Sequence, residues 1–377
     1  MLDVFAVADL LVAEAREAYG EDVAIIVYYG SYATSSASQY SDLDMYYIPD
    51  DGKAESLYRT FVIEDLPFEF WPVSWGFAQR VASAKHHWSV APSLIANGRI
   101  LYSRSAEDLA RFNALKAQIA ELQKPENKAL LVLQALETYK TVAFQLDKLR
   151  LARTRHDRLG TRWAGCNLVE AVLDCLALVN QTFFTRNWAS HPEQVLSLTI
   201  RPEHLKDLIE ATVTAGDPAR IEESAEMLAR ETREILVREQ QCVTRPFTVA
   251  SVFRDDFPYP AIKEYVNKIV SACEKRNLIG ASYVAAIMQH ELAYMLAQAE
   301  TGVVFLDFNL YDEYGGPFQR LPFPDLASAI EEGDFAKIAE QARLFDRRAQ
   351  EYYAQHGVSL NVVASMDDLE AFIRKKP

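Results

Sequence analysis

Residues 23–48 read VAIIVYYGSYATSSASQYSDLDMYYI, and this stretch decides the fold of the N-terminal part of the chain. Its β-branched and aromatic run at 23–29 predicts a buried strand that ends at Gly30-Ser31. A small, polar connection follows, and residues 42–48 predict a second strand that opens with Asp42-Leu43-Asp44. Because alternate residues of a strand share one face, we expect the two carboxylates to project together, about 6.5–7 Å apart along the chain.

This pair of carboxylates suits a divalent cation, because Mg²⁺ prefers oxygen ligands and is often bound together with nucleotide phosphates. Residues 67–75 predict another strand, in which Glu69 lies between two phenylalanines. Glu69 is therefore the candidate third carboxylate of a site for two ions. Gly30 would let the backbone approach a phosphate, and Ser31 with the following helix start would offer hydrogen-bond donors to it.

The neighbouring segments complete a small mixed α/β unit. Apolar residues at helical spacing predict a helix over 4–19, and RILYS at 99–103 predicts a further strand. Ser105 and Asp108 have the spacing of a helix N-cap, and the pattern after them is almost all helical. The sequence thus predicts an α+β protein, with a small mixed-sheet domain at 1–105 followed by a large all-helical region.

The helical region contains an internal repeat. AGCNLVEAVL at 164–173 resembles IGASYVAAIM at 279–288, and GDPARI at 216–221 resembles GDFAKI at 333–338. The two offsets, 115 and 117 positions, are nearly the same, which indicates a duplication. In each copy an aspartate is expected to cap a long amphipathic helix, at 218–241 and at 335–356. We therefore expect one helical copy at 106–245 and a second at 246–377.

Composition narrows the classes of protein to which the chain could belong. The formal net charge is −14, which disfavours a nucleic-acid partner and suits a cationic substrate or a metal site. No apolar run is long enough to span a membrane, and the N-terminus lacks the pattern of a signal peptide. The four cysteines have no metal-binding spacing, so we expect reduced, buried thiols in a cytoplasmic protein. His86-His87-Trp88 is interpreted as a surface loop.

At Gly30-Ser31 and Asp42-Leu43-Asp44 the sequence resembles the nucleotidyltransferase superfamily, which has a DNA polymerase beta-like fold. Its motif is an apolar strand ending in Gly-Ser, about ten residues, and then an acidic–apolar–acidic strand. Within it, AYGEDVAIIVYYGS at 18–31 and YSDLDM at 40–45 resemble the kanamycin (aminoglycoside 4′) nucleotidyltransferase family. Weaker similarity continues through GRILYS at 98–103 and LDKLRLAR at 146–153. The resemblance covers roughly residues 12–245 and leaves 246–377 without a counterpart.

The resemblance implies an Mg²⁺-dependent transferase that binds ATP or another nucleoside triphosphate at Gly30 and Ser31. It implies two Mg²⁺ ions, held by Asp42, Asp44 and Glu69. A hydroxyl of the acceptor would attack the α-phosphorus, and pyrophosphate would leave. Lys148 matches a lysine that the family's helical domain offers to the nucleotide.

The general base is the point of departure from the family. The family has a glutamate one turn before the lysine, and Phe144 stands there in this chain. Glu137, two turns earlier on nearly the same helix face, is one candidate replacement. Glu69 is the other.

The resemblance favours a small hydroxylated acceptor similar to an aminoglycoside, and thus a role in antibiotic resistance. One alternative is an enzyme that adenylylates a protein, as in toxin–antitoxin systems of the same superfamily. Another is a protein that binds a nucleotide without catalysis.

The second helical copy also bears on the oligomeric state. In the family, two subunits pair so that each completes the other's site. The second copy of this chain would take the partner's place, which favours a monomer over a homodimer. The alternative is an appendage that packs elsewhere and leaves the dimer intact.

Overall fold

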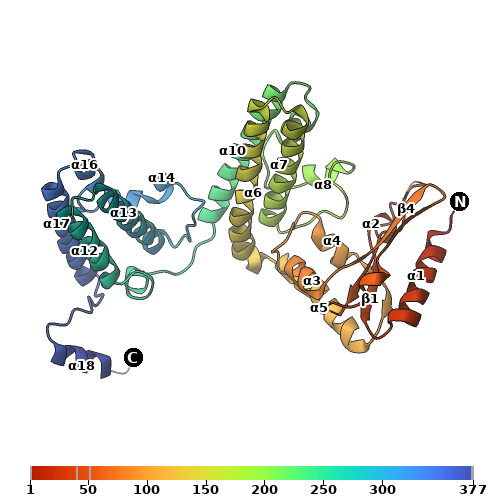
Figure 1. Cartoon of the computed structure of the whole chain (residues 1–377), viewed down its shortest axis with the longest axis horizontal. Helices are drawn as coiled ribbons and strands as arrows, with labels where there is room; N and C mark the ends of the chain where they lie inside the picture. The colour runs from red at the N-terminus through yellow and green to blue at the C-terminus, as the bar shows by residue number, and fades with distance from the viewer. Residues whose placement is uncertain (1, 40, 51, 375–377) are drawn as a thin grey trace. The chain divides into compact units, whose positions relative to one another are not determined.

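The computed structural model describes residues 2–39, 41–50 and 52–374, so Tyr40 of the decisive stretch lies outside the described residues. The chain divides into two compact units, Met1–Cys242 and Val243–Pro377 (Figure 1). The first unit holds a five-stranded sheet and a helical region, and the described part of the second is helical. The predicted α+β class is confirmed. The boundary expected at residue 105 falls inside the first unit and stays a prediction.

The sheet is mixed, with the strand order β3-β4-β2-β1-β5. β1 pairs antiparallel with β2 and β5, β2 pairs parallel with β4, and β3 pairs antiparallel with β4. The strands are β1 (Val23–Tyr28), β2 (Met45–Pro49), β3 (Arg59–Ile63), β4 (Leu66–Pro72) and β5 (Arg99–Ser103).

Sequence reasoning missed β3. Four of its five residues are exposed, so it lacks the alternation of buried and exposed positions that marks a strand. Glu64 and Asp65 join it to β4, and both have positive φ, 47° and 63°. A two-residue hairpin turn of this kind is normally signalled by Asn-Gly or Asp-Gly, and Glu-Asp gives no such signal.

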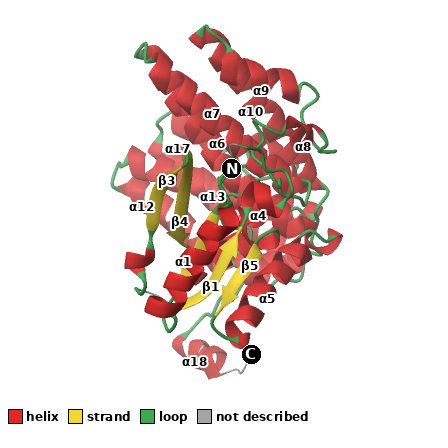
Figure 2. Cartoon of the chain, turned by 90° about the vertical axis from the view of Figure 1, so that its right-hand side faces the viewer, coloured by secondary structure: helices red, strands yellow, loops and turns green. Residues whose placement is uncertain are grey.

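Helices cover the sheet and fix its two faces. The predicted N-terminal helix is α1 (Val4–Tyr19), which lies over one face of the sheet (Figure 2). Its apolar side packs with Met45 and Tyr47 of β2 in one buried cluster. Tyr46 points the other way, since its hydroxyl donates to the carbonyl of Leu94 in α4 (Ala91–Ala96) at 3.1 Å. β2 is thus buried on both faces.

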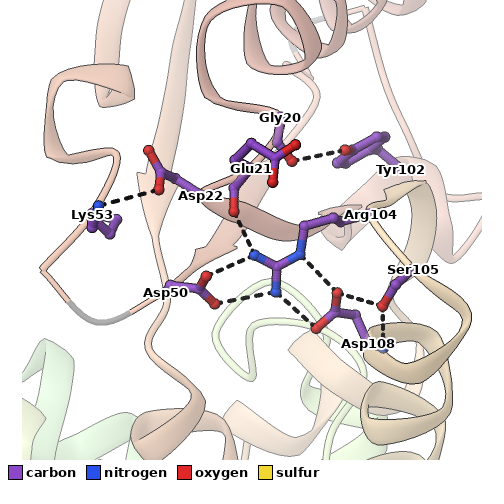
Figure 3. Close-up of polar contacts among 9 residues, drawn as sticks. All are labelled: Gly20, Glu21, Asp22, Asp50, Lys53, Tyr102, Arg104, Ser105 and Asp108. Carbon is purple, nitrogen blue, oxygen red and sulfur yellow. Dashed lines mark hydrogen bonds and ion pairs between the residues drawn. The ribbon is translucent and has the colours of Figure 1, made fainter.

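Arg104 ties the end of the sheet to the helical region (Figure 3). Its guanidinium donates to both carboxylate oxygens of Asp50, after β2, and to both of Asp108, at the start of α5 (Ala106–Leu122). It also donates to the carbonyl of Glu21 at 2.7 Å. Ser105 accepts a hydrogen bond from the Asp108 backbone N–H, as the sequence predicts for an N-cap. Burial opposes ionisation of Asp108, but hydrogen bonds from Arg104 and Ser105 lower its pKa overall.

The first unit continues as a bundle in which α6, α7 and α10 pack side by side (Figure 1). Helix α9 packs against α7 and α10. None of the helices in the described part of the chain combines the length and apolarity that crossing a bilayer requires. The remaining helices of this unit are α2 (Gly30–Ala33), α3 (Trp75–Ala82), α6 (Lys128–Thr154), α7 (Arg158–Val179), α8 (Pro192–Leu196), α9 (Leu205–Thr214) and α10 (Pro218–Gln241).

The second unit is built around α12, α13 and α17, which enclose a separate apolar core. In that core the Tyr259 hydroxyl donates to Asp346 Oδ1 at 2.8 Å, and Lys263 Nζ lies 2.6 Å from Asp346 Oδ2. The helices are α11 (Val249–Ser251), α12 (Tyr259–Glu274), α13 (Leu278–Thr301), α14 (Tyr311–Tyr314), α15 (Gly316–Gln319), α16 (Leu326–Glu331), α17 (Phe335–Gln355) and α18 (Met366–Arg374).

The two units repeat the same helical hairpin. In the first, His156 has a left-handed φ of 57° and Asp157 caps α7 by accepting from the N–H of Gly160. In the second, Arg276 has a φ of 54° and Asn277 caps α13 by accepting from the N–H of Gly280. The local geometry therefore supports the duplication and relates α7 to α13 by 120 positions.

The expected offset of 115 for this helix pair is wrong. It would match the buried Ala164 with Ile279, which is 84% exposed. At 120 positions the partner of Ile279 is Leu159, which is 78% exposed. Helical stretches of small and apolar residues can be aligned in several registers. The positions of the capping residues, Asp157 and Asn277, show which register is correct. The offset of 117 for α10 and α17 is supported, because Asp217 and Asp334 cap these helices as predicted.

The four cysteines are free, as expected. Cys175 and Cys273 are buried as expected, whereas Cys166 is half-buried and Cys242, directly after the last residue of α10, is exposed.

We expect Arg104→Met to lower the free energy of unfolding by about 2 kcal/mol, because it leaves Asp108 without its charged partner at a nearly buried position. The midpoint of urea denaturation measures this. Lys53→Met is the matched control: Lys53 lies 3.5 Å from Asp22 but is largely exposed, so its loss should cost less than about 0.5 kcal/mol. Equal effects of the two substitutions would contradict the role given to Arg104.

Candidate active site

Asp42 and Asp44 lie in the segment that leads into β2, and not within the strand as predicted. β2 begins at Met45, three residues later than the sequence pattern indicates. Asp44 is nevertheless fixed to the sheet, because the backbone N–H of Tyr29 donates to its carbonyl at 3.0 Å. The two ends of the connection between β1 and β2 are thus held together at one edge.

Gly30 is required by this close approach. Its φ is +73°, in the left-handed region that side chains disfavour. A Cβ atom at this position would overlap the Asp44 carboxylate. The Gly-Ser element predicted to accept a phosphate therefore also places the backbone directly against a candidate metal ligand. Ser31 follows at half-buried exposure in the four-residue helix α2.

Glu69 joins the aspartates through the parallel pairing of β2 and β4. Met45 is the register partner of Phe70, so the residues just before them, Asp44 and Glu69, approach the same edge of the sheet. The Tyr58 hydroxyl donates to Glu69 Oε1 at 3.3 Å. The sheet order therefore brings the third predicted carboxylate to the first two.

The electrostatics show that the three carboxylates interact. Burial, followed by the charges of Asp42 and Glu69, raises the pKa of Asp44 to about 6. Burial also raises the pKa of Asp42, against a backbone hydrogen bond that lowers it. Negative charges brought together in this way disfavour their own ionisation, and a cation between them would remove that cost.

All three candidate ligands are carboxylates, and an all-oxygen set fits Mg²⁺. Across the described ranges, no group of three or more His, Cys, Asp or Glu side chains is arranged so that it could hold a metal ion. The assignment of Mg²⁺ to Asp42, Asp44 and Glu69 stays a prediction.

Glu137 and Lys148 lie on a different element, α6. Lys140 Nζ lies 2.8 Å from Glu137 Oε2, and both side chains are about half exposed. Lys148 Nζ lies 5.6 Å from the ring centre of Phe144, one turn earlier in the helix. The structure therefore brings Glu69 and Gly30 toward Asp44, while the ion pair of Glu137 and the aromatic contact of Lys148 lie within α6.

The hairpin register reveals a feature that sequence comparison missed. At 120 positions, Phe144 corresponds to Glu264 and Lys148 corresponds to Lys268, both in α12. Lys268 Nζ lies 2.6 Å from Glu264 Oε1. The glutamate–lysine spacing that the resemblance leads us to expect on α6 is thus present on α12 of the second unit.

Two aromatic residues beside the carboxylates were also not singled out as functional. The Trp71 indole N–H donates to the Tyr29 hydroxyl at 3.2 Å. Burial, followed by the charge of Asp44, raises the pKa of Tyr29 to about 12, and Glu69 and Asp42 act in the same direction. Tyr29 is therefore neutral at pH 7 and adds no further negative charge. Its position directly before Gly30 was the available signal.

The interpretation of His86-His87-Trp88 as a surface loop is wrong for Trp88, which is 1% exposed. His87 Nδ1 lies 3.0 Å from Asp174 Oδ2 on α7, a contact between residues 87 positions apart. No local sequence pattern signals such a distant partner.

Comparison with known protein families gives a match in the helical region of the first unit. Residues 109–242 match the family model of the KNTase C-terminal domain. This match confirms the relationship to kanamycin nucleotidyltransferase, in the nucleotidyltransferase superfamily, that the motif from Gly30 to Asp44 predicts. The relationship supports nucleotidyl transfer as the general function, and therefore an enzyme of the transferase class. The matched region runs from α5 to the end of the first unit.

A search among curated proteins gives no match. Among solved structures, a nucleotidyltransferase-like protein from Exiguobacterium sibiricum 255-15 is similar to this chain, with 13% sequence identity and a TM-score of 0.36. The similarity covers 68% of this chain and 86% of that one.

We expect Asp44→Asn to raise the thermal midpoint of the metal-free protein when it is measured at a pH above 7. The native pKa of Asp44, about 6, lies above its ordinary value of 3.8, so the ionised form costs stability above pH 6. That cost disappears as the pH falls from about 6 to below 3.8, because the native state is protonated first. Thermal denaturation in a chelator at pH 8 and pH 5 measures the difference between variant and wild type. A difference in thermal midpoint that is absent at pH 8, or equal at pH 8 and pH 5, would contradict the claim that ionised Asp44 destabilises the metal-free protein.

Proposed function

We propose that this protein transfers a nucleoside monophosphate, from ATP or another nucleoside triphosphate, to a hydroxyl of a small molecule similar to an aminoglycoside. The observation that carries the proposal is the close approach of Gly30 to the Asp44 carboxylate, whose ionisation the charges of Asp42 and Glu69 oppose. The family match of residues 109–242 supports the same class of reaction independently, because it covers a different part of the chain.

In this proposal the turn at Gly30-Ser31 holds the nucleotide phosphates, and the three carboxylates hold Mg²⁺. Bound Mg²⁺ would neutralise charge on the transferring phosphoryl group and align the reacting oxygens. Gly30 contributes by having no side chain, because any Cβ would displace Asp44. The Tyr29 hydroxyl, which burial keeps neutral and which the Trp71 indole N–H orients, forms a wall beside the carboxylates.

We assign the acceptance of the hydroxyl proton to Glu69, in preference to Glu137. Glu69 lies on β4 next to the register partner of Met45, and its charge raises the pKa of Asp44, which favours a role for Glu69 at the same site. Glu137 has its partner, Lys140, on its own helix. Glu69 would then have two roles, as a metal ligand and as the base, and the pH dependence of turnover in Glu69→Gln tests the second role.

The direct test is pyrophosphate release from ATP and GTP in the presence of Mg²⁺, across a panel of aminoglycosides and candidate proteins. We expect release that depends on a small hydroxylated acceptor and falls at least a thousandfold in Asp44→Asn, because such sites lose most of their electrostatic stabilisation with one ligand. Release that depends only on a protein acceptor would favour protein adenylylation. Nucleotide binding without release for any acceptor would favour a non-catalytic protein, and both results would contradict the proposal.

We also expect Lys148→Ala to raise the KM for the nucleotide much more than the KM for the acceptor, because lysine acts as a point charge on phosphate. Steady-state kinetics, with calorimetry of a non-hydrolysable ATP analogue, measures both. Lys140→Ala, two turns earlier on α6, is the matched control and should leave nucleotide affinity unchanged. Unaltered affinity in Lys148→Ala would remove Lys148 from the site.

A further inference from the structure

A cavity of about 270 Å³ lies within the first unit, between the loop 84–88 and the helices α6 and α7. Bulk water occupies about 30 Å³ per molecule, so the cavity has room for roughly nine waters. Polar and apolar atoms contribute about equally to its lining, and the polar side chains include Gln145 of α6, Glu170 and Asp174 of α7, and Lys85, His86 and Trp88 of the loop.

Two buried polar atoms of this lining have no hydrogen-bond partner among the described residues. One is the indole N–H of Trp88, a side chain that is 1% exposed. The other is Oε1 of Gln145. Buried polar groups without partners cost stability, and native proteins contain few of them. Here a donor without an acceptor and an acceptor without a donor line the same cavity.

The cavity walls are held in place. Asp174 is 3% exposed and accepts from the backbone N–H of Ser89 at 2.7 Å as well as contacting His87 Nδ1. The hydrogen bond to Asp174 raises the pKa of His87, which favours an ion pair that cancels the charge of Asp174. Burial lowers the pKa of His86, which keeps it neutral. Lys85 and Glu170 carry opposite charges. The lining as a whole therefore suits a group with many hydroxyls.

A row of aromatic contacts connects the cavity to the carboxylates. The ring centres of His86 and Phe77 are 4.8 Å apart, and those of Phe77 and Trp71 are 6.5 Å apart. Trp71 in turn donates to Tyr29, which interacts with Asp44. A ligand in the cavity would thus lie at one end of a continuous wall that has the candidate metal ligands at its other end.

We propose that this cavity binds a hydroxyl-rich ring of the acceptor, with hydroxyls that accept from Trp88 Nε1 and donate to Gln145 Oε1. A hydroxyl is both donor and acceptor, so one chemical group satisfies both orphaned atoms. The inference rests on the proposed function for the identity of the ligand as acceptor, but the binding itself requires neither nucleotide nor metal.

The test is isothermal titration of the full chain with kanamycin and with myo-inositol, in the absence of nucleotide and divalent ions. We expect Trp88→Phe and Gln145→Leu each to weaken binding about tenfold, because each removes one hydrogen bond and keeps most of the side-chain volume. Trp163→Phe is the control for the first variant, since Trp163 is an exposed indole on α7 that does not line the cavity. Asp44→Asn should leave this binding unchanged.

Circular dichroism and thermal denaturation show whether each variant folds, and the two variants change different elements. Failure to bind either compound at millimolar concentration, or equal affinity in both cavity variants and the wild type, would overturn the inference. Pyrophosphate release separates this from the proposed function. If binding depends on the cavity residues but no acceptor gives pyrophosphate release, the cavity inference stands and the proposed nucleotidyl transfer is contradicted. If transfer occurs and both cavity variants have an unchanged KM for the acceptor, the proposed function stands and the cavity inference is contradicted.

Discussion

The burial of the Asp44 carboxyl beside two further carboxylates, those of Asp42 and Glu69, is the constraint on which the candidate site depends. Burial, followed by the charges of Asp42 and Glu69, raises the pKa of Asp44 to about 6, so the ionised form of Asp44 destabilises the metal-free protein. The strand order that places β2 between β1 and β4 brings Glu69 to the aspartates, and the absence of a side chain at Gly30 leaves room for Asp44. A fold that holds unfavourable charges together at such a site retains them for a use other than stability, which is why they identify the candidate site.

Sequence reasoning succeeded where the determining interactions are local. β1, α1, β5 and the caps at Ser105, Asp217 and Asp334 follow from apolar periodicity and from side chains that bond to backbone within three residues. The aspartates were found because motif spacing is also local, although the strand begins only after them. What failed depends on distant partners: β3 has no buried face of its own, and the burial of Trp88 depends on a loop that Asp174 of α7 holds in place.

The internal repeat shows the same limit from another side. A match of apolar letters suggested a common register for both helix pairs, whereas the capped hairpins at Asp157 and Asn277 show that α7 and α13 require 120 positions. In that register, Phe144 and Lys148 of α6 correspond to Glu264 and Lys268 of α12.

The central claim is that Asp42, Asp44 and Glu69 form one site for divalent cations with a nucleotide. Electron paramagnetic resonance of Mn²⁺, titrated into the full chain with a non-hydrolysable ATP analogue, tests it most directly because the signal reports bound metal without any acceptor. The account predicts nucleotide-dependent Mn²⁺ binding by the wild type and its loss in Asp44→Asn, with the folded state intact in both. Equal Mn²⁺ binding by the two proteins would contradict it.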